Sequence, residues 1–247
     1  MKRYFFECCY DGSNYHGWQF QPNAISVQEI IEKSILKFFN ETKVSIVGCG
    51  RTDAGVHANQ FFFHLDCESN IEIKDFIHKV NTILPRDVSV FNGWSVNPDF
   101  HARFSALKRT YLYIISTQKN PFDDKFSYLI KDNLDVDLMN KCADELLKHK
   151  DFTSFSKVNT DVNNNLCEIF ECFWTKKEKQ LIFQISANRF LRNMVRAIVG
   201  TMLDVGKGRL TLNDFKSIIK DHDRSSAGSS APAKGLFLNK VKYPNWP

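Results

Sequence analysis

Residues 48–57, with the sequence GCGRTDAGVH, place an aspartate and an arginine close together between glycines and so form a candidate reactive loop. The loop fails the dinucleotide-binding pattern G-x-G-x-x-G, because Asp53 holds the third glycine position and its carboxylate would repel a pyrophosphate. It also fails the P-loop pattern, because Val56 and His57 follow Gly55 where Lys and Ser or Thr are required. The loop therefore offers a carboxylate rather than a phosphate-binding site.

Asp53 is the candidate for a catalytic carboxylate, and Arg51 lies two residues before it. A nearby guanidinium favours the ionised, and hence nucleophilic, form of a carboxylate. Aspartate is also common in loops as an Asx-turn or a helix cap, so these residues alone leave a structural role open.

A second stretch combines positive charge with aromatic rings. In residues 99–113, DFHARFSALKRTYLY, basic and aromatic side chains are interspersed, which suits RNA because bases stack on aromatic rings and phosphates pair with Arg or Lys. An ordinary edge strand with a solvated face is the alternative. Tyr111 and Tyr113 lie on the same face of any strand formed there.

A third stretch, residues 188–200 with the sequence NRFLRNMVRAIVG, has helical spacing. It predicts a helix from 189 to about 205 with a polar face that we call the arginine stripe. The members of the stripe are Arg189, Arg192, Asn193 and Arg196. No acidic residue interrupts it, so it predicts a phosphate track or a carboxylate clamp, with a merely solvated face as the alternative.

The elements that would position these residues follow the order β-α-β-β-α-β twice, which predicts an α+β protein of two ferredoxin-like units. Ser26 and Glu29 form a capping box at the start of the first helix. The strands expected in the first half lie near 3–10, 43–48, 60–66 and 87–96, with a second helix near 74–83. In the second half the strands lie near 110–116, 167–175, 180–187 and 236–242, with helices near 136–148, 189–205 and 212–220. The halves join near 97–109, and residues 222–234 are expected to form a polar, mobile surface loop.

The composition is that of a globular protein, with 247 residues of which 43% are hydrophobic and 25% charged. No apolar run reaches the roughly 18 residues that span a bilayer, and Glu7 interrupts any signal-peptide core, so an intracellular protein is expected. The seven cysteines include no Cys-x-x-Cys pair, which predicts buried free thiols in a reducing compartment. A net charge of +5 permits a nucleic-acid partner without establishing one.

Taken together, these stretches resemble the TruA family of tRNA pseudouridine synthases over nearly the whole chain and in the same order. The run RTDAGVH at 51–57 is highly specific to that family. The other matching segments are YDGS at 10–13, GWQ at 17–19, SVQE at 26–29, FHARFSA at 100–106, DFTSF at 151–155, the segment 190–201, and GL at 235–236.

The resemblance implies an α+β pseudouridine synthase fold of two ferredoxin-like halves with an RNA-binding cleft between them. Residues 1–105 would form the half that carries the loop of Asp53, and residues 106–247 would complete the active site. The implied reaction converts uridine to pseudouridine in the anticodon stem-loop of tRNA, at positions 38, 39 and 40, without a metal, nucleotide or redox cofactor. The implied partners are tRNA and a second copy of the chain, in the cytoplasm and away from membranes.

The same resemblance implies a role for each candidate residue. Asp53 would be the catalytic aspartate, which attacks C1′ of the sugar or C6 of the base, or assists glycal formation. Tyr111 would contact the target base and help to remove the C5 proton, and Arg51 would fill the gap left by the flipped uridine. Arg196 would pair with Asp53. The remaining substrate-binding candidates are Arg189 and Arg192.

Two segments depart from the family pattern. Residues 157–165, KVNTDVNNN, are less basic than expected for a segment that faces tRNA, and LCEI at 166–169 replaces the Arg-Thr-Ile common in the family. His57 and His101 belong to matching motifs but are assigned no catalytic role. A non-catalytic RNA-binding protein on the same fold and a synthase with other RNA targets are the competing interpretations. The first is disfavoured because a carboxylate in an RNA cleft weakens binding.

Overall fold

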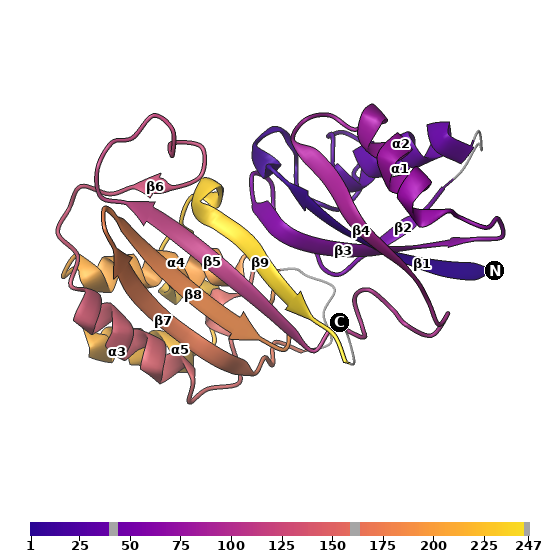
Figure 1. The fold of residues 1–247 in the computed structure, drawn as a ribbon. Helices are drawn as coiled ribbons and strands as arrows, with labels where there is room; N and C mark the ends of the chain where they lie inside the picture. Colours follow the sequence, from indigo (N-terminus) through magenta and orange to yellow (C-terminus); the bar gives the residue numbers. More distant parts are fainter. Residues whose placement is uncertain (40–43, 159–163, 245–247) are drawn as a thin grey trace. The chain divides into compact units, whose positions relative to one another are not determined.

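The computed structural model describes residues 1–39, 44–158 and 164–244, and it divides into two compact units (Figure 1). Unit 1 comprises Met1–Leu107 and Leu238–Pro247, and unit 2 comprises Lys108–Phe237. Residue 43, where a strand is expected to begin, lies outside the described residues. Part of the weakly basic segment 157–165 also lies outside them. Among the described residues, none of the helices combines the length and the hydropathy that a bilayer span requires.

Unit 1 has the predicted element order β-α-β-β-α-β. Strand β1 is antiparallel to both β3 and β4, and the short strand β2 pairs antiparallel with β3. Ser26 caps the first helix as predicted, because the Glu29 N–H donates to Ser26 Oγ at 3.2 Å. The elements are β1 (Lys2–Tyr10), α1 (Val27–Phe39), β2 (Ile46–Gly48), β3 (His57–Cys67), α2 (Ile73–Ile83) and β4 (Val88–Val96).

Both faces of the unit 1 sheet are buried by aromatic rings, which explains much of the high phenylalanine content. On the face covered by the helices, Phe6 stacks on Phe76 of α2 with ring centroids 4.6 Å apart. On the other face, Phe5 meets Phe100 and Tyr243, each with centroids 5.1 Å apart. The segment after β4 and the end of the chain therefore complete the core of this unit.

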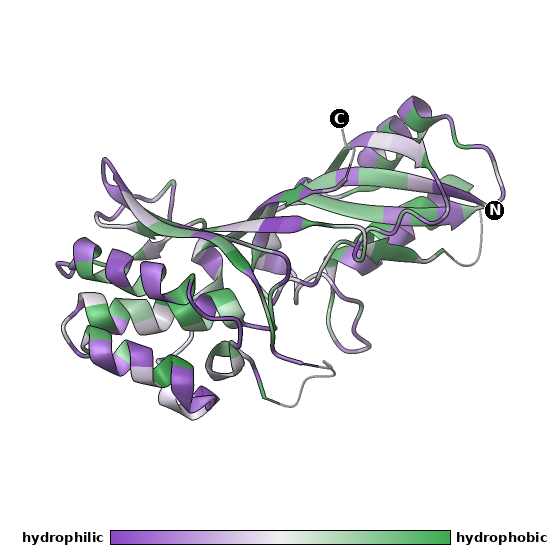
Figure 2. Ribbon diagram, turned by 90° about the horizontal axis from the view of Figure 1, so that it is seen from below, coloured by the Kyte–Doolittle hydropathy of each residue, from purple (hydrophilic) through white to green (hydrophobic). Residues whose placement is uncertain are grey.

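Unit 2 repeats the predicted order with one extra short strand. Strand β5 is antiparallel to β8, β8 is antiparallel to β7, and the two-residue strand β6 runs parallel to β5. Helices α3, α4 and α5 cover one face of this sheet (Figure 1), and hydrophobic and hydrophilic residues alternate along the helices of this unit in Figure 2. The elements are β5 (Lys108–Ser116), β6 (Tyr128–Leu129), α3 (Val136–Leu146), β7 (Ile169–Lys177), β8 (Gln180–Ala187), α4 (Met194–Gly206), α5 (Leu212–Asp221) and β9 (Leu236–Lys242). Strand β9 begins in unit 2 and ends in unit 1.

The prediction that a helix begins at residue 189 is wrong, because α4 begins at Met194. Asn193 has a φ of 66°, a left-handed conformation that asparagine tolerates but that cannot continue a right-handed helix. Arg189 and Arg192 therefore precede the helix, and only Arg196 lies on it. The arginine stripe is not one helical face.

Residues 222–234 form a surface loop, as predicted, and part of this loop packs on α4. The Gly228 N–H donates to Thr201 Oγ1 at 3.0 Å. A Cβ at Gly200 would lie 1.8 Å from the Ser229 carbonyl oxygen, so glycine at position 200 permits a close backbone approach. The segment also holds two short 3₁₀ turns, Arg224–Ser226 and Ala233–Gly235.

Candidate active-site residues

Asp53 lies half-buried in the loop between β2 and β3, and hydrogen bonds hold this loop on both sides of it. Before Asp53, the Thr52 hydroxyl bonds to the Tyr10 hydroxyl at 2.9 Å, and the Thr52 carbonyl accepts from the Trp18 N–H at 3.2 Å. After Asp53, the Gly55 N–H donates to the Tyr15 carbonyl at 3.1 Å. The loop is therefore fixed against residues 10–18, which comprise the end of β1 and the segment that follows it.

Two glycines explain why residues 10–18 can approach the loop so closely. A Cβ at Gly17, which has a φ of +90°, would lie 2.3 Å from the Thr52 carbonyl oxygen. A Cβ at Gly12 would lie 2.0 Å from the Val56 carbonyl oxygen. No side chain fits at either place, so the segments YDGS and GWQ are spatially tied to the RTDAGVH loop.

His57 is buried and has a structural hydrogen bond. Its Nδ1 accepts from the Gly12 N–H at 3.0 Å and lies 3.0 Å from Asp11 Oδ1. His101 similarly accepts from the N–H groups of Arg103 and Phe104, at 3.0 and 3.2 Å. Both histidines therefore hold backbone turns in place.

Arg51 is the other candidate in unit 1, and its side chain is exposed at the start of the loop. The remaining candidates, Tyr111, Arg189, Arg192 and Arg196, belong to unit 2. The predicted pairing of Arg196 with Asp53 joins the two units and stays a prediction.

Tyr111 lies on β5 opposite Ile185 of β8, and only 8% of it is exposed. Its ring makes an edge contact with Phe190, with centroids 5.0 Å apart and planes at 85°. Tyr113, on the same face, donates its hydroxyl to the Pro232 carbonyl at 2.8 Å, and burial raises its pKa. Tyr113 therefore has a structural role, whereas Tyr111 sits beside the turn that carries Arg189 and Arg192.

The three arginines of unit 2 have different surroundings. Arg196, in the first turn of α4, donates from Nε to the Ala231 carbonyl at 2.7 Å and is half-buried. Arg192 is exposed and Arg189 is half-buried, and both precede the helix. The structure thus gives Arg192 the accessibility that a phosphate contact needs, and it gives Arg196 a fixed orientation.

The described residues include no group of three or more His, Cys, Asp or Glu side chains that could hold a metal ion. All seven cysteines are free thiols, and burial raises the pKa of Cys167 to about 11. The expectation of unpaired, mostly buried thiols is confirmed.

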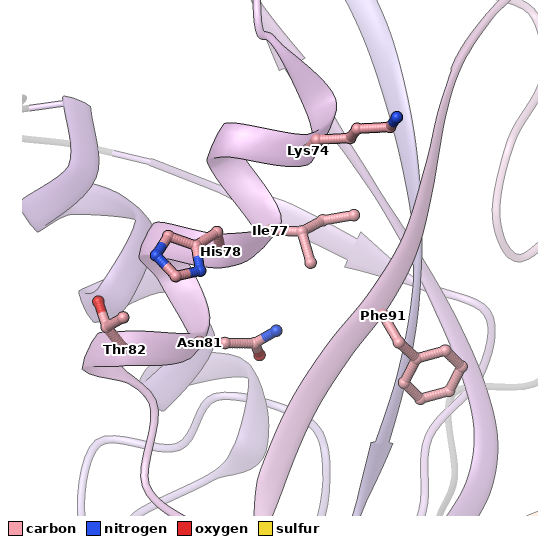
Figure 3. A pocket seen from close by; sticks show the side chains of 6 residues that line it. All are labelled: Lys74, Ile77, His78, Asn81, Thr82 and Phe91. Carbon is pink, nitrogen blue, oxygen red and sulfur yellow. The ribbon is translucent and has the colours of Figure 1, made fainter.

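A hollow in unit 1 lies between α2 and β4, and its lining includes none of the candidate site residues (Figure 3). Its polar residue Asn81 already bridges the N–H and carbonyl of Val90, at 2.9 and 2.5 Å. The amide therefore serves to join helix and strand. The lining residues are Lys74, Ile77, His78, Asn81, Thr82 and Phe91.

Sequence reasoning assigned no role to Tyr15, and it missed Asp87 altogether. Asp87 lies in the loop between α2 and β4, and it accepts from the Tyr15 hydroxyl at 2.5 Å. Nothing in the local sequence of residue 87 signals this contact, because its partner comes from a distant segment.

Most of this chain matches a known protein family and several known proteins. The family described as tRNA pseudouridine synthase matches residues 9–105 and 143–244. A tRNA pseudouridine synthase A from Bacteroides thetaiotaomicron is 49% identical, over 99% of this chain and 91% of that protein. Proteins of the same name from Bacteroides fragilis and Parabacteroides distasonis are 48% and 47% identical, each over 99% of this chain and 97% of the relative. The matched ranges include the Asp53 loop and Arg196.

Proposed function

Because the chain belongs to the tRNA pseudouridine synthase family, and is therefore an isomerase that acts on tRNA, we propose that Asp53 is its catalytic carboxylate. The observation that carries the proposal is the loop that presents Asp53, which is held on both sides through Thr52 and Gly55. Such restraint supports catalysis, because a reacting group must be kept in a productive position. A surface aspartate that merely capped a turn would not need it.

The reaction rearranges one nucleotide without gain or loss of atoms. The bond between N1 and C1′ breaks, the uracil turns, a bond forms between C5 and C1′, and the C5 proton is replaced by a proton on N1. The Asp53 carboxylate would attack C1′ or C6, or assist loss of a sugar proton in glycal formation. All three routes require the ionised carboxylate.

The other candidate residues take roles around this step. We assign Tyr111 to contact with the target base and to removal of the C5 proton, which its place beside the Phe190 ring supports. Arg51, exposed at the start of the loop, would occupy the space left by the flipped uridine. Arg196 would pair with the carboxylate. The proposed phosphate contacts are Arg189 and Arg192.

We propose the anticodon stem-loop as the target, with uridines at positions 38, 39 and 40, and a cytoplasmic homodimer as the working form. The test uses unmodified tRNA transcripts in which cytidine replaces uridine at all but one of these positions. Pseudouridine should form at the remaining uridine. Modification of a transcript that lacks all three uridines would overturn the target assignment, and binding without any conversion would favour a non-catalytic RNA-binding protein.

A further inference from the structure

Asp87 forms hydrogen bonds with three residues of the segment that follows β1. Its Oδ1 accepts from the Tyr15 hydroxyl at 2.5 Å, and its Oδ2 accepts from the Asn14 side-chain amide at 3.0 Å. Its backbone carbonyl accepts from the Asp11 N–H at 2.9 Å. One residue of the α2–β4 loop therefore holds the 3₁₀ turn Gly12–Asn14 and both of its flanking residues.

This same turn supports the loop of Asp53. The Tyr15 carbonyl accepts from the Gly55 N–H at 3.1 Å. The Gly12 N–H donates to Nδ1 of His57 at 3.0 Å, and the Gly12 carbonyl accepts from the Tyr15 N–H at 3.0 Å. A continuous set of contacts thus runs from Asp87 through Tyr15 to the residues that follow Asp53.

The bond between Asp87 and Tyr15 is of a strong kind. Tyr15 is buried. Burial is the main cause that raises the pKa of its hydroxyl, and the hydrogen bond to the Asp87 carboxylate is the second cause, so the phenol keeps its proton. A hydroxyl that donates to a carboxylate forms a shorter and stronger bond than one between neutral groups. Loss of the acceptor would leave a largely buried donor unpaired, which favours movement of the turn.

We propose that Asp87 is a positioning residue that sets the place of the Asp53 carboxylate through Tyr15 and the Gly12–Asn14 turn. It touches neither substrate nor reacting atoms. This inference rests on the proposed catalytic role of Asp53.

The exchange of two side chains tests this inference. In D87N, Tyr15 keeps only a neutral acceptor, and the Asn14 amide must turn to present its oxygen to the new amide. In N14D/D87N, the amide at position 87 donates to the carboxylate at position 14, which restores a negative charge to the pair and fixes the amide oxygen that accepts from Tyr15. D87N should lower the single-turnover rate of pseudouridine formation about tenfold or more, because small misplacements of a catalytic group are costly. Affinity for tRNA should stay unchanged, and N14D/D87N should recover most of the rate.

Two further variants sharpen the test. Y15F removes the hydroxyl whose bond D87N weakens, so the effects of the two changes on the rate should not add. D75N is the matched control, because it removes one carboxylate from the same unit and breaks an exposed ion pair with Lys79 at 2.9 Å. D75N should keep the full rate.

For each variant, the thermal unfolding temperature and the tRNA affinity are measured together with the single-turnover rate. An unchanged rate in D87N, or a restored stability in N14D/D87N without a restored rate, would overturn the inference. If D87N does not fold, Y15F and N14D/D87N carry the same comparison. D53N is measured in parallel. Activity in D53N defeats the proposed function, whereas an inactive D53N beside a fully active D87N defeats only the role of Asp87.

Discussion

Arg196 and Ala231 bond to each other twice, since Arg196 Nε donates to the Ala231 carbonyl at 2.7 Å and the Ala231 N–H donates to the Arg196 carbonyl at 2.9 Å. This pair ties the first turn of α4 to the segment after α5. It also fixes the arginine side chain at its Nε, while the two terminal nitrogens of the guanidinium lie beyond that bond. The orientation suits a residue that must present positive charge at a defined place.

R196A should therefore lower turnover more than tRNA affinity, because it removes the positive charge proposed to pair with Asp53. It should also reduce the free energy of unfolding by about 1 kcal/mol, through loss of the bond to Ala231. R192A is the comparison, because Arg192 is exposed. That variant should weaken tRNA binding and reduce the salt slope by about one unit with little change in turnover. Equal, small losses of turnover and tRNA affinity in R196A and R192A would indicate that both arginines are merely solvated.

G17A should destabilise the protein and reduce its activity. Gly17 has a φ of +90°, and an added Cβ would lie 2.3 Å from the Thr52 carbonyl oxygen beside Asp53. The strained backbone alone should cost roughly 1–3 kcal/mol of unfolding free energy. G50A is the matched control, because a Cβ at Gly50 would meet no heavy atom within 4 Å. Denaturant unfolding of both variants checks this, and equal stability would contradict the close approach.

The stability of unit 1 should fall in acid because of His64. This buried side chain accepts from the Ala102 N–H at Nδ1, at 3.1 Å, and burial is the main cause that lowers its pKa from 6.5 to about 4. The unfolded chain therefore takes up a proton at a higher pH than the folded chain does. The stabilisation is complete above about pH 6.5 and is lost as pH falls through about 4, to a total of up to about 3 kcal/mol.

The check for His64 is the unfolding free energy of wild type and H64N between pH 7.5 and pH 4. H64N lacks the titrating group, so its stability should fall less steeply over this range. Parallel curves for the two proteins would show that His64 contributes nothing to the acid dependence.

Pseudouridine formation should persist in EDTA. The described residues offer no metal cluster, and the proposed reaction is completed by carboxylate and phenol groups of the chain. The assay uses unmodified tRNA and monitors tRNA melting alongside, since a divalent ion can act on the RNA fold alone. Loss of activity on chelation with intact tRNA, restored by one particular metal, would overturn this expectation.

The sequence predicted those parts of the fold that depend on local patterns. Alternating and helical hydrophobic spacing gave the element order of both units, and the Ser26–Glu29 pair gave the start of α1. The sequence did not predict where α4 begins, because the periodic spacing continues through Asn193 and no local pattern marks the left-handed conformation of that residue. The two-residue strand β6 was too short to leave a pattern.

The candidate site was predictable only where it follows a motif. The loop of Asp53 is recognisable from its residues, and the roles proposed for Tyr111 and Arg51 come from the family resemblance alone. Asp87 could not be found in this way, because its contacts with Tyr15 and Asn14 form only when segments distant in the sequence meet. The same holds for the close approaches at Gly12 and Gly17, whose reason is visible only in the folded chain.

The most direct test of the central claim is the rate of pseudouridine formation by D53N on unmodified tRNA. The amide is nearly isosteric, so the loop should keep its fold, but it cannot act as an anionic nucleophile. Activity should disappear, a loss of at least several kcal/mol of transition-state stabilisation, while tRNA affinity stays close to wild type or rises. D53E, which keeps the charge but displaces it, should lose about a hundredfold. Measurable turnover by a folded D53N, beyond what deamidation back to aspartate explains, would contradict the account.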